Sequence, residues 1–203
     1  MTFERLGFLA SHNGTNMQSI INACRRGRLA ARPVVVISNN GSSGALERAE
    51  NEGIPAYHIG SRTFPDPDDL DRAICETLKR HQVDLVILAG YMKHLGPRTL
   101  AEFRGRVINI HPSLLPRYGG QGMYGEKVHA AVLAAGDRET GVTVHLVDEH
   151  YDAGPILAQV TVPVREGDTV RSLADRVLAV EHETYVDTLA RILSGEITLP
   201  VEA

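Results

Sequence analysis

The sequence has no tryptophan and only two cysteines among its 203 residues. Cys24 and Cys75 lie far apart in the chain and form no C-x-x-C motif, so neither a disulfide framework nor a zinc site is indicated. No apolar stretch reaches the roughly 18 residues that a membrane span needs. We therefore expect a cytoplasmic protein with free thiols, no metal site and no membrane partner.

The sequence also has no excess of positive charge. It contains 21 Lys and Arg residues and 25 Asp and Glu residues, so its formal net charge is -4. Proteins that bind nucleic acids usually carry a basic face. The densest basic cluster, Arg25, Arg26 and Arg28, lies at the end of a predicted helix, where cations complement the helix dipole. The expected partners are therefore small molecules and not nucleic acids, and the sequence is compatible with a homodimer.

Short, partly β-branched apolar runs alternate with helix-like segments in the first half of the chain. The runs lie at residues 6–10, 33–38, 56–59, 84–89 and 107–110. Helical patterns begin near Asn16 and near Asp68. Such alternation is typical of βαβ units, which build a parallel sheet with helices on both faces. The predicted fold class is therefore α/β and Rossmann-like.

The pattern changes after residue 110. A loop rich in proline and glycine covers 111–125, a helix is predicted at 126–135, and two strands at 142–147 and 156–164 flank the polar turn 148–154. A hairpin-like pair of strands indicates that the mostly parallel sheet becomes mixed in the C-terminal half. A last helix is predicted from Val170 to about Leu193. No low-complexity linker divides the chain, so we expect a single domain over 1–203.

A glycine-bearing turn, residues 11–16 (SHNGTN), joins the first predicted strand to the first predicted helix. Backbone N–H groups at a helix N-terminus bind anions, and Gly14 lets a ligand come close while Thr15 and Asn16 add side-chain donors. An ordinary turn with Asn16 as the helix cap fits the same residues. The turn lacks the glycine fingerprint of dinucleotide sites and the lysine of a Walker loop, so NAD and ATP are not expected ligands.

Asn109 lies in the strand predicted at 107–110, and His111 directly follows that strand, just before Pro112. The two-residue period of a strand places both side chains on one face. An amide there can donate to a developing oxyanion and an imidazole can carry a proton, so the pair suits acyl chemistry. A buried histidine is usually structural, but this setting favours a catalytic role.

Asp152 is followed by residues 153–155 (AGP), a small, stiff segment that can hold a carboxylate in a pocket. There it would raise the pKa of a nearby histidine and orient water. The neighbouring acids Asp148 and Glu149 are predicted to be solvated. The sequence contains no G-x-S-x-G elbow and no H-E-x-x-H motif, which disfavours covalent catalysis and metal-dependent hydrolysis.

Residues 109–116 (NIHPSLLP), together with 152–155 (DAGP), resemble the signature of the 10-formyltetrahydrofolate-dependent formyltransferases. The similarity runs from the first strand to residues 181–183 of the last helix. Within that family, the turn at 11–16 and the chain length are similar to those of members that formylate phosphoribosylglycinamide in purine biosynthesis. The resemblance implies 10-formyltetrahydrofolate as co-substrate, with a phosphate-binding half at about 1–105 and a catalytic and folate-binding half at about 106–203.

The resemblance also implies roles for single residues. Asn109 and His111 would act on the formyl carbonyl, and Asp152 would pair with His111 and organise proton transfer. The acceptor would be held at its phosphate and its ribosylglycinamide by Gly14, Thr15, Asn16 and Glu181. Folate contacts would come from Met92, Lys93, His94, Leu95, Asn109, Asp148, Tyr151 and Asp152. His145 matches a family histidine on the strand that leads to Asp152.

Two features depart from the family pattern. Pro67 stands about where some relatives place an arginine that faces the folate tail, so the tail is expected to be held differently. The loop 118–125 (YGGQGMYG) is longer and richer in glycine than the typical version, and a lid that closes on binding is one interpretation of it.

Other functions fit parts of the same pattern. A formyltetrahydrofolate hydrolase would use the same Asn, His and Asp with water as acceptor, but it would not need the turn at 11–16. Formyltransferases that act on another amine, a sugar nucleotide or methionyl-tRNA, generally carry a further C-terminal domain, and we expect none after Pro200. A non-catalytic binding protein of nucleotide-binding fold would need the turn but not Asn109, His111 and Asp152.

Overall fold

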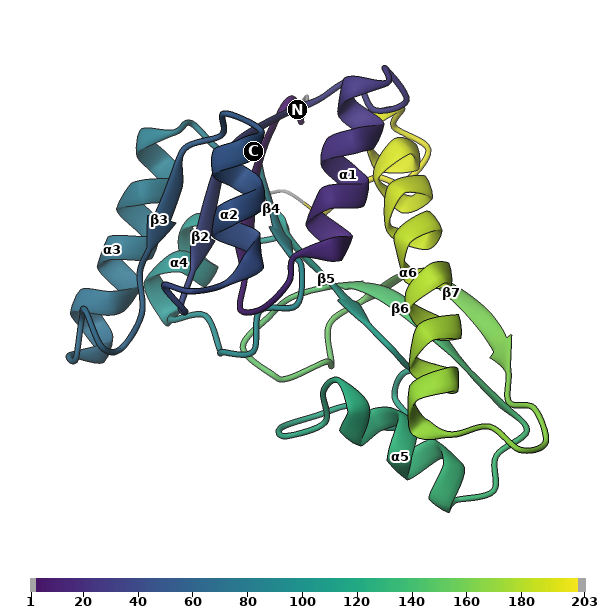
Figure 1. The fold of residues 1–203 in the computed structure, drawn as a ribbon. Coiled ribbons are helices and arrows are strands. Elements are labelled where there is room, and N and C mark those ends of the chain that lie inside the picture. Colours follow the sequence, from purple (N-terminus) through teal and green to yellow (C-terminus); the bar gives the residue numbers. More distant parts are fainter. Residues whose placement is uncertain (1–2, 201–203) are drawn as a thin grey trace.

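The β-sheet carries the site, and its strands follow the apolar runs of the sequence closely. In the computed structural model, which describes residues 3–200, the strands are β1 (Arg5–Ala10), β2 (Arg32–Ser38), β3 (Ala56–His58), β4 (Leu85–Leu88), β5 (Val107–His111), β6 (Glu139–Leu146) and β7 (Ile156–Pro163). The seven strands lie in the order β3-β2-β1-β4-β5-β6-β7 (Figure 1).

Six of the seven strands run in one direction, and β6 alone is reversed. β1 to β5 pair in parallel, whereas β6 runs antiparallel to β5 and β7 runs antiparallel to β6. The predicted Rossmann-like sheet that becomes mixed in its C-terminal half is therefore confirmed. The change matters for the site, because the antiparallel neighbour brings a residue of β6 opposite each residue of β5.

Helices cover both faces of the sheet, as expected. They are α1 (Thr15–Arg25), α2 (Gly44–Asn51), α3 (Pro67–Arg80), α4 (Pro97–Glu102), α5 (Glu126–Ala134) and α6 (Val170–Leu193). On one face, Phe8 of β1 belongs to a core with Met17 of α1 and Leu189 of α6. On the other face, Leu9 belongs to a core with Leu78 of α3. The alternating side chains of β1 thus bury one core on each side of the sheet.

Two helices begin elsewhere than the sequence indicated. Asn16 does not cap α1, because Gly14 is the N-cap residue with a left-handed φ of 67° and Asn16 is buried inside the first turn. Asp68 does not open α3 either, since the carboxylate of Asp66 accepts the N–H groups of Asp68 and Asp69 and Pro67 is the first helical residue. Proline suits that first position because its missing N–H would have no partner there.

The Tyr185 side chain connects the long helix α6 to the sheet through hydrogen bonds. Its side chain is fully buried, and its hydroxyl lies 3.0 Å from the Leu88 carbonyl oxygen and 3.1 Å from that of Ile108. Leu88 ends β4 and Ile108 lies in β5, so the hydroxyl holds α6 against two neighbouring strands. Glu181 lies one helical turn earlier on α6, and its position depends on this attachment. Figure 1 shows α6 running beside α1 along this face of the molecule.

No helix of residues 3–200 has the length and apolarity needed to cross a membrane.

We predict that Tyr185→Phe lowers the free energy of unfolding by about 1–2 kcal/mol, because it removes the donor from two buried carbonyl groups and leaves the ring packing intact. Chemical denaturation followed by circular dichroism measures the change. Tyr124→Phe is the matched control, since Tyr124 is 43% exposed. Equal stability of Tyr185→Phe and the wild-type protein would show that the hydroxyl does not hold α6.

Candidate active site

Two adjoining cavities lie beyond the carboxyl ends of β4 and β5. The smaller has a volume of about 450 Å3 and is lined by Asn109, His111 and Asp152. The larger has a volume of about 800 Å3 and lies against α3 and α4. Both cavities include Tyr91, Lys93 and His94 in their walls. Ligand sites at the carboxyl ends of strands are typical of open α/β sheets.

β5 delivers Asn109 and His111 to the wall of the smaller cavity. Asn109 is half-buried, whereas only 4% of His111 is exposed. In the antiparallel register, Asn109 lies opposite His145 of β6, and His111 lies opposite Thr143. Asn109 and His111 therefore lie together, as the two-residue period of a strand predicted. The structure also places His145 opposite Asn109, which that period could not predict.

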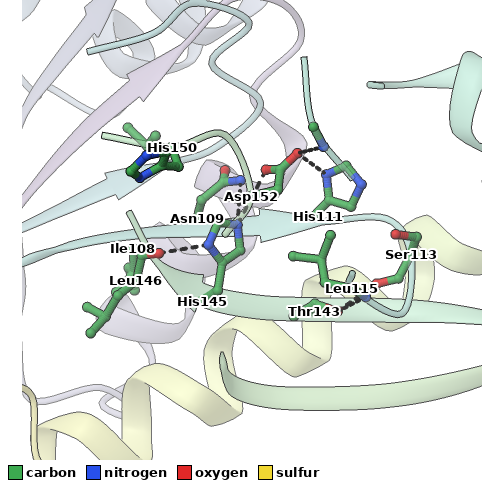
Figure 2. Close-up of polar contacts among 12 residues, drawn as sticks. Ile108, Asn109, His111, Ser113, Leu115, Thr143, His145, Leu146, His150 and Asp152 are labelled. Carbon is green, nitrogen blue, oxygen red and sulfur yellow. Dashed lines mark hydrogen bonds and ion pairs between the residues drawn. The ribbon is translucent and has the colours of Figure 1, made fainter. Parts of the chain in front are cut away.

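Asp152 lies between two histidines (Figure 2). Its Oδ2 atom is 3.5 Å from Nδ1 of His111, and its Oδ1 atom is 3.6 Å from Nε2 of His145. Oδ2 also accepts the backbone N–H of Gly120 at 2.9 Å. Burial alone would raise the pKa of Asp152, but His145, His111 and the Gly120 N–H together outweigh it, so the pKa is lowered. The carboxyl group is therefore ionised at neutral pH.

His111 is held from both sides of its ring. Its Nε2 atom lies 2.8 Å from the Tyr118 carbonyl oxygen, and this acceptor requires the hydrogen to be on Nε2. In the neutral ring, the Nδ1 lone pair then faces the Asp152 carboxylate, which is favourable only once Nδ1 gains a proton. The surroundings are thus arranged for the imidazolium form.

The pKa of His111 is nevertheless lowered. Burial is the largest cause, and it outweighs the raising effects of the Asp152 carboxylate and the Tyr118 carbonyl. The expected raising effect of Asp152 on a nearby histidine is therefore present at His111, but burial makes the net pKa shift downward. The desolvation of this almost fully buried ring depends on the many side chains packed around it, and their positions cannot be predicted from the local sequence.

His145 orients the Asn109 amide. Its Nδ1 atom lies 2.8 Å from the Leu146 carbonyl oxygen, so this nitrogen carries the hydrogen. In the neutral ring, Nε2 is then an acceptor, and Nδ2 of Asn109 donates to it at 3.1 Å. The contact of this nitrogen with Asp152 Oδ1 at 3.6 Å is therefore close but is not a hydrogen bond. The amide nitrogen of Asn109 is thereby directed to a fixed side, with its second hydrogen left to donate elsewhere. No local sequence pattern indicates this role of His145, because only the register of β5 and β6 pairs it with Asn109.

The wall of the smaller cavity also contains Asn16 and Glu181. The Asn16 amide donates to Glu181 Oε2 at 2.7 Å, and burial raises the pKa of Glu181 to about 7 against the opposing effect of this bond. Gly14 and Thr15 form the start of α1 and do not contribute to the described cavity wall. Arg48 of α2 also contacts the turn at 11–16, although no motif in the sequence pointed to this residue. Its Nε atom donates to the Asn13 carbonyl oxygen at 2.8 Å and so stabilises the turn.

The residues expected to contact folate divide between the two cavities. Met92 and Tyr151 line the smaller, Leu95 and Asp148 line the larger, and Lys93 and His94 line both. Pro67, at the start of α3, also lines the larger cavity. Its wall is largely apolar and includes Leu70, Ile74, Leu95, Leu100 and Val147.

The loop 118–125 covers part of the smaller cavity with Gly120, Gln121, Gly122, Met123, Tyr124 and Gly125. Two of its backbone groups, the Tyr118 carbonyl and the Gly120 N–H, bond to His111 and Asp152. These contacts cannot be predicted from residue types, since any residue supplies the same backbone groups. Within residues 3–200, no group of three or more His, Cys, Asp or Glu side chains could hold a metal ion.

Comparison with known proteins relates the chain to one family. Residues 4–189 match the family described as formyl transferase. A chloroplastic phosphoribosylglycinamide formyltransferase of Vigna unguiculata is 41% identical over 195 residues, which cover 96% of this chain and 62% of that protein. The chain therefore spans less than two thirds of the length of this plant relative.

Solved structures share the fold over nearly the whole chain. Glycinamide ribonucleotide transformylase 1 of Symbiobacterium toebii has a TM-score of 0.91 and 40% identity, with 99% of this chain and 92% of that chain covered. A formyltetrahydrofolate deformylase of Pseudomonas syringae pv. tomato is less similar, with a TM-score of 0.84 and 28% identity over 96% of this chain and 63% of that chain.

We predict that Asp152→Asn lowers the pKa of His111 further, because the carboxylate that raises it is replaced by a neutral amide of the same shape. An NMR pH titration of the His111 ring protons measures the change. Asp148→Asn is the control, since this acid lies in the same turn but contacts His150. A raised or unchanged pKa of His111 in Asp152→Asn would contradict the electrostatic analysis.

Proposed function

The chain belongs to the formyl transferase family, and we propose that it transfers the formyl group of 10-formyltetrahydrofolate to the amine of phosphoribosylglycinamide in purine biosynthesis. The observation that carries the proposal is the Asp152 carboxylate, held between His111 and His145 and beside the oriented amide of Asn109. This arrangement supplies an oxyanion donor, a group that can gain a proton, and a fixed negative charge in one cavity wall.

The reaction begins when the amine nitrogen attacks the formyl carbon. The carbonyl oxygen then becomes a tetrahedral oxyanion, which accepts a hydrogen bond from the Asn109 amide. Its negative charge raises the pKa of His111, which takes up the proton that the attacking nitrogen releases through water ordered by Asp152. The imidazolium therefore forms together with the oxyanion, with Asp152 facing its Nδ1 atom. Because burial keeps His111 neutral beforehand, the favourable charge pairing exists in the transition state and not in the free protein.

Collapse of the intermediate completes the transfer. His111 then returns this proton through the same water to the departing N10 nitrogen of the folate and becomes neutral again. The bond from the formyl carbon to N10 breaks, and the products are the formylated amine and tetrahydrofolate. No resident cofactor or metal takes part in these steps, since the folate enters as a co-substrate.

The two cavities suit the two substrates. The cavity of about 800 Å3, with Leu95, Leu100 and Val147 in its wall, accommodates the flat pterin of the donor. The acceptor occupies the smaller cavity, with its ribosylglycinamide portion near Glu181 and its phosphate at the N-terminus of α1. Residues 1–203 act as one formyltransferase domain, and the loop 118–125 closes over the bound acceptor as a lid.

Hydrolysis of the donor is the second candidate, because a formyltetrahydrofolate deformylase shares the fold at 28% identity. Water would replace the amine, and the same Asn109, His111 and Asp152 would act. The buried pair of Asn16 and Glu181 favours the transferase, since water as acceptor gives no reason for this polar pair in the cavity wall.

Consumption of 10-formyltetrahydrofolate, measured with and without phosphoribosylglycinamide, tests the function. We predict that consumption requires the acceptor and yields one formylated product for each tetrahydrofolate formed. Consumption without the acceptor would favour the hydrolase. No consumption in either case would reject both enzymes and leave a binding protein of the same fold.

We predict that Asn109→Ala lowers kcat by about 10²–10³, the usual effect of removing one oxyanion donor. Asn51→Ala is the matched control, because Asn51 is an exposed residue at the end of α2. Steady-state kinetics with both substrates give kcat and each KM, and thermal unfolding verifies that the variant folds. Near-normal turnover of Asn109→Ala would remove this residue from the mechanism.

A further inference from the structure

Tyr118 connects His111 to the turn that follows α5 through one backbone contact and one side-chain contact. Its carbonyl oxygen lies 2.8 Å from Nε2 of His111. Its hydroxyl donates to Oδ2 of Asp137 at 2.7 Å. Asp137 lies in the turn between α5 and β6, and neither Tyr118 nor Asp137 belongs to the wall of either cavity. A turn outside both cavities is therefore linked to a residue of the site.

The backbone of Tyr118 has a left-handed conformation, with a φ of 56°. Residues other than glycine, asparagine and aspartate seldom adopt this conformation, and it persists only where surrounding contacts hold it. In this conformation, the carbonyl oxygen reaches His111 while the side chain reaches Asp137. The hydroxyl contact is thus one of the contacts that keep the carbonyl oxygen beside His111.

Asp137 is well suited to hold the Tyr118 hydroxyl. Its side chain is only 15% exposed, and its Oδ2 atom also forms an ion pair with Arg117 at 2.6 Å. The hydrogen bond from Tyr118 and the one from Arg117 lower the pKa of Asp137, so the carboxyl group is ionised at neutral pH. A hydrogen bond to an ionised acceptor is stronger than one between neutral groups.

The Tyr118 carbonyl determines which nitrogen of the neutral His111 ring carries the hydrogen. An acceptor beside Nε2 places the hydrogen there and leaves a lone pair on Nδ1. The distance of 3.5 Å between Nδ1 and Asp152 Oδ2 agrees, because it is longer than an N–H···O hydrogen bond (Figure 2). Without the carbonyl at Nε2, the neutral ring would favour a hydrogen on Nδ1, donated to the Asp152 carboxylate.

The position of this hydrogen affects the proposed reaction. His111 takes up a proton through water ordered by Asp152, and Nδ1 is the ring nitrogen that faces Asp152. A ring with its hydrogen on Nε2 can accept the proton at Nδ1. A ring with its hydrogen on Nδ1 could accept only at Nε2, which faces the Tyr118 carbonyl instead of that water.

We propose that Tyr118 and Asp137 are positioning residues, whose hydrogen bond holds the Tyr118 carbonyl at His111 and thereby selects the tautomer that accepts a proton at Nδ1. The catalytic consequence rests on the proposed function, whereas the tautomer of His111 does not. Because the two residues lie outside both cavity walls, their hydrogen bond contributes to kcat and not to the KM of either substrate.

Nitrogen chemical shifts of the His111 ring, measured by NMR above its pKa, report the tautomer directly. The wild-type ring carries its hydrogen on Nε2. Tyr118→Phe removes only the hydroxyl, so the ratio of the Nε2–H to the Nδ1–H form falls about three- to tenfold, the effect of one hydrogen bond on an equilibrium. Asp137→Ala gives the same decrease, and Asp137→Asn, whose amide oxygen still accepts the hydroxyl, gives a smaller one.

Both substitutions remove the same hydrogen bond, so the double variant Tyr118→Phe, Asp137→Ala shifts the tautomer no further than either single variant. The titratable neighbours that act on His111 are Asp152, His145 and His129, and these variants leave all three in place. A change in the ring nitrogen shifts therefore reports the loss of the Tyr118–Asp137 bond.

Steady-state kinetics test the catalytic consequence. Tyr118→Phe lowers kcat by the same three- to tenfold as the tautomer ratio, about one hydrogen bond, while both KM values stay near normal. Tyr57→Phe is the matched control, because the Tyr57 hydroxyl also contacts a side chain, His81 Nε2 at 3.1 Å, and lies outside both cavity walls. It leaves the tautomer and the kinetics unchanged, and thermal unfolding verifies that every variant folds.

The outcomes separate the two proposals. If the wild-type protein transfers no formyl group, the proposed function fails, and the ring nitrogen shifts still test the hydrogen bond. A wild-type His111 ring with its hydrogen on Nδ1, or an unchanged ratio in both Tyr118→Phe and Asp137→Ala, rejects the selection of the tautomer. A shifted ratio with normal kcat, or raised KM values at normal kcat, rejects its role in catalysis.

Discussion

The contact of the Asp152 carboxylate with His111 and His145 is the interaction on which the rest of the site depends. The three residues come from β5, β6 and the turn before β7, so the contact exists only when all three segments are in register. The same carboxylate accepts the Gly120 N–H and thereby also fixes the loop 118–125. A displacement in any one of these segments would alter the surroundings of both histidines.

Burial also shifts the pKa values of two other side chains in the wall of the same cavity, His111 and Glu181. It lowers the pKa of His111 despite the adjacent carboxylate, and it raises that of Glu181 to about 7. Both side chains are thus biased toward their neutral forms when the cavities contain no ligand. A site of this kind stabilises charge mainly when the reaction creates it, because the carboxylate of Asp152 is already in place and its partner is not yet protonated. The proposed formyl transfer uses this difference between the free protein and the transition state.

Much of the fold could be predicted from local patterns. The strands fall within a few residues of the apolar runs, and α6 occupies the range Val170–Leu193 that its pattern indicated. Helix starts were less predictable, because several polar residues near an N-terminus can each act as a cap. Asp66 and Gly14 occupy those positions, whereas Asn16 turns inward to Glu181, a partner 165 residues away. Such a distant partner leaves no trace in the local sequence.

Local sequence patterns are enough to predict the alternation of strands and helices and the placement of Asn109 and His111 on one strand face, since both follow from periods of a few residues. The tertiary structure alone decided that His145 orients Asn109, that Asp152 contacts both histidines, and that the net pKa shift of His111 is downward. Strand register and desolvation depend on neighbours from distant segments, and a local sequence pattern holds no information about those neighbours.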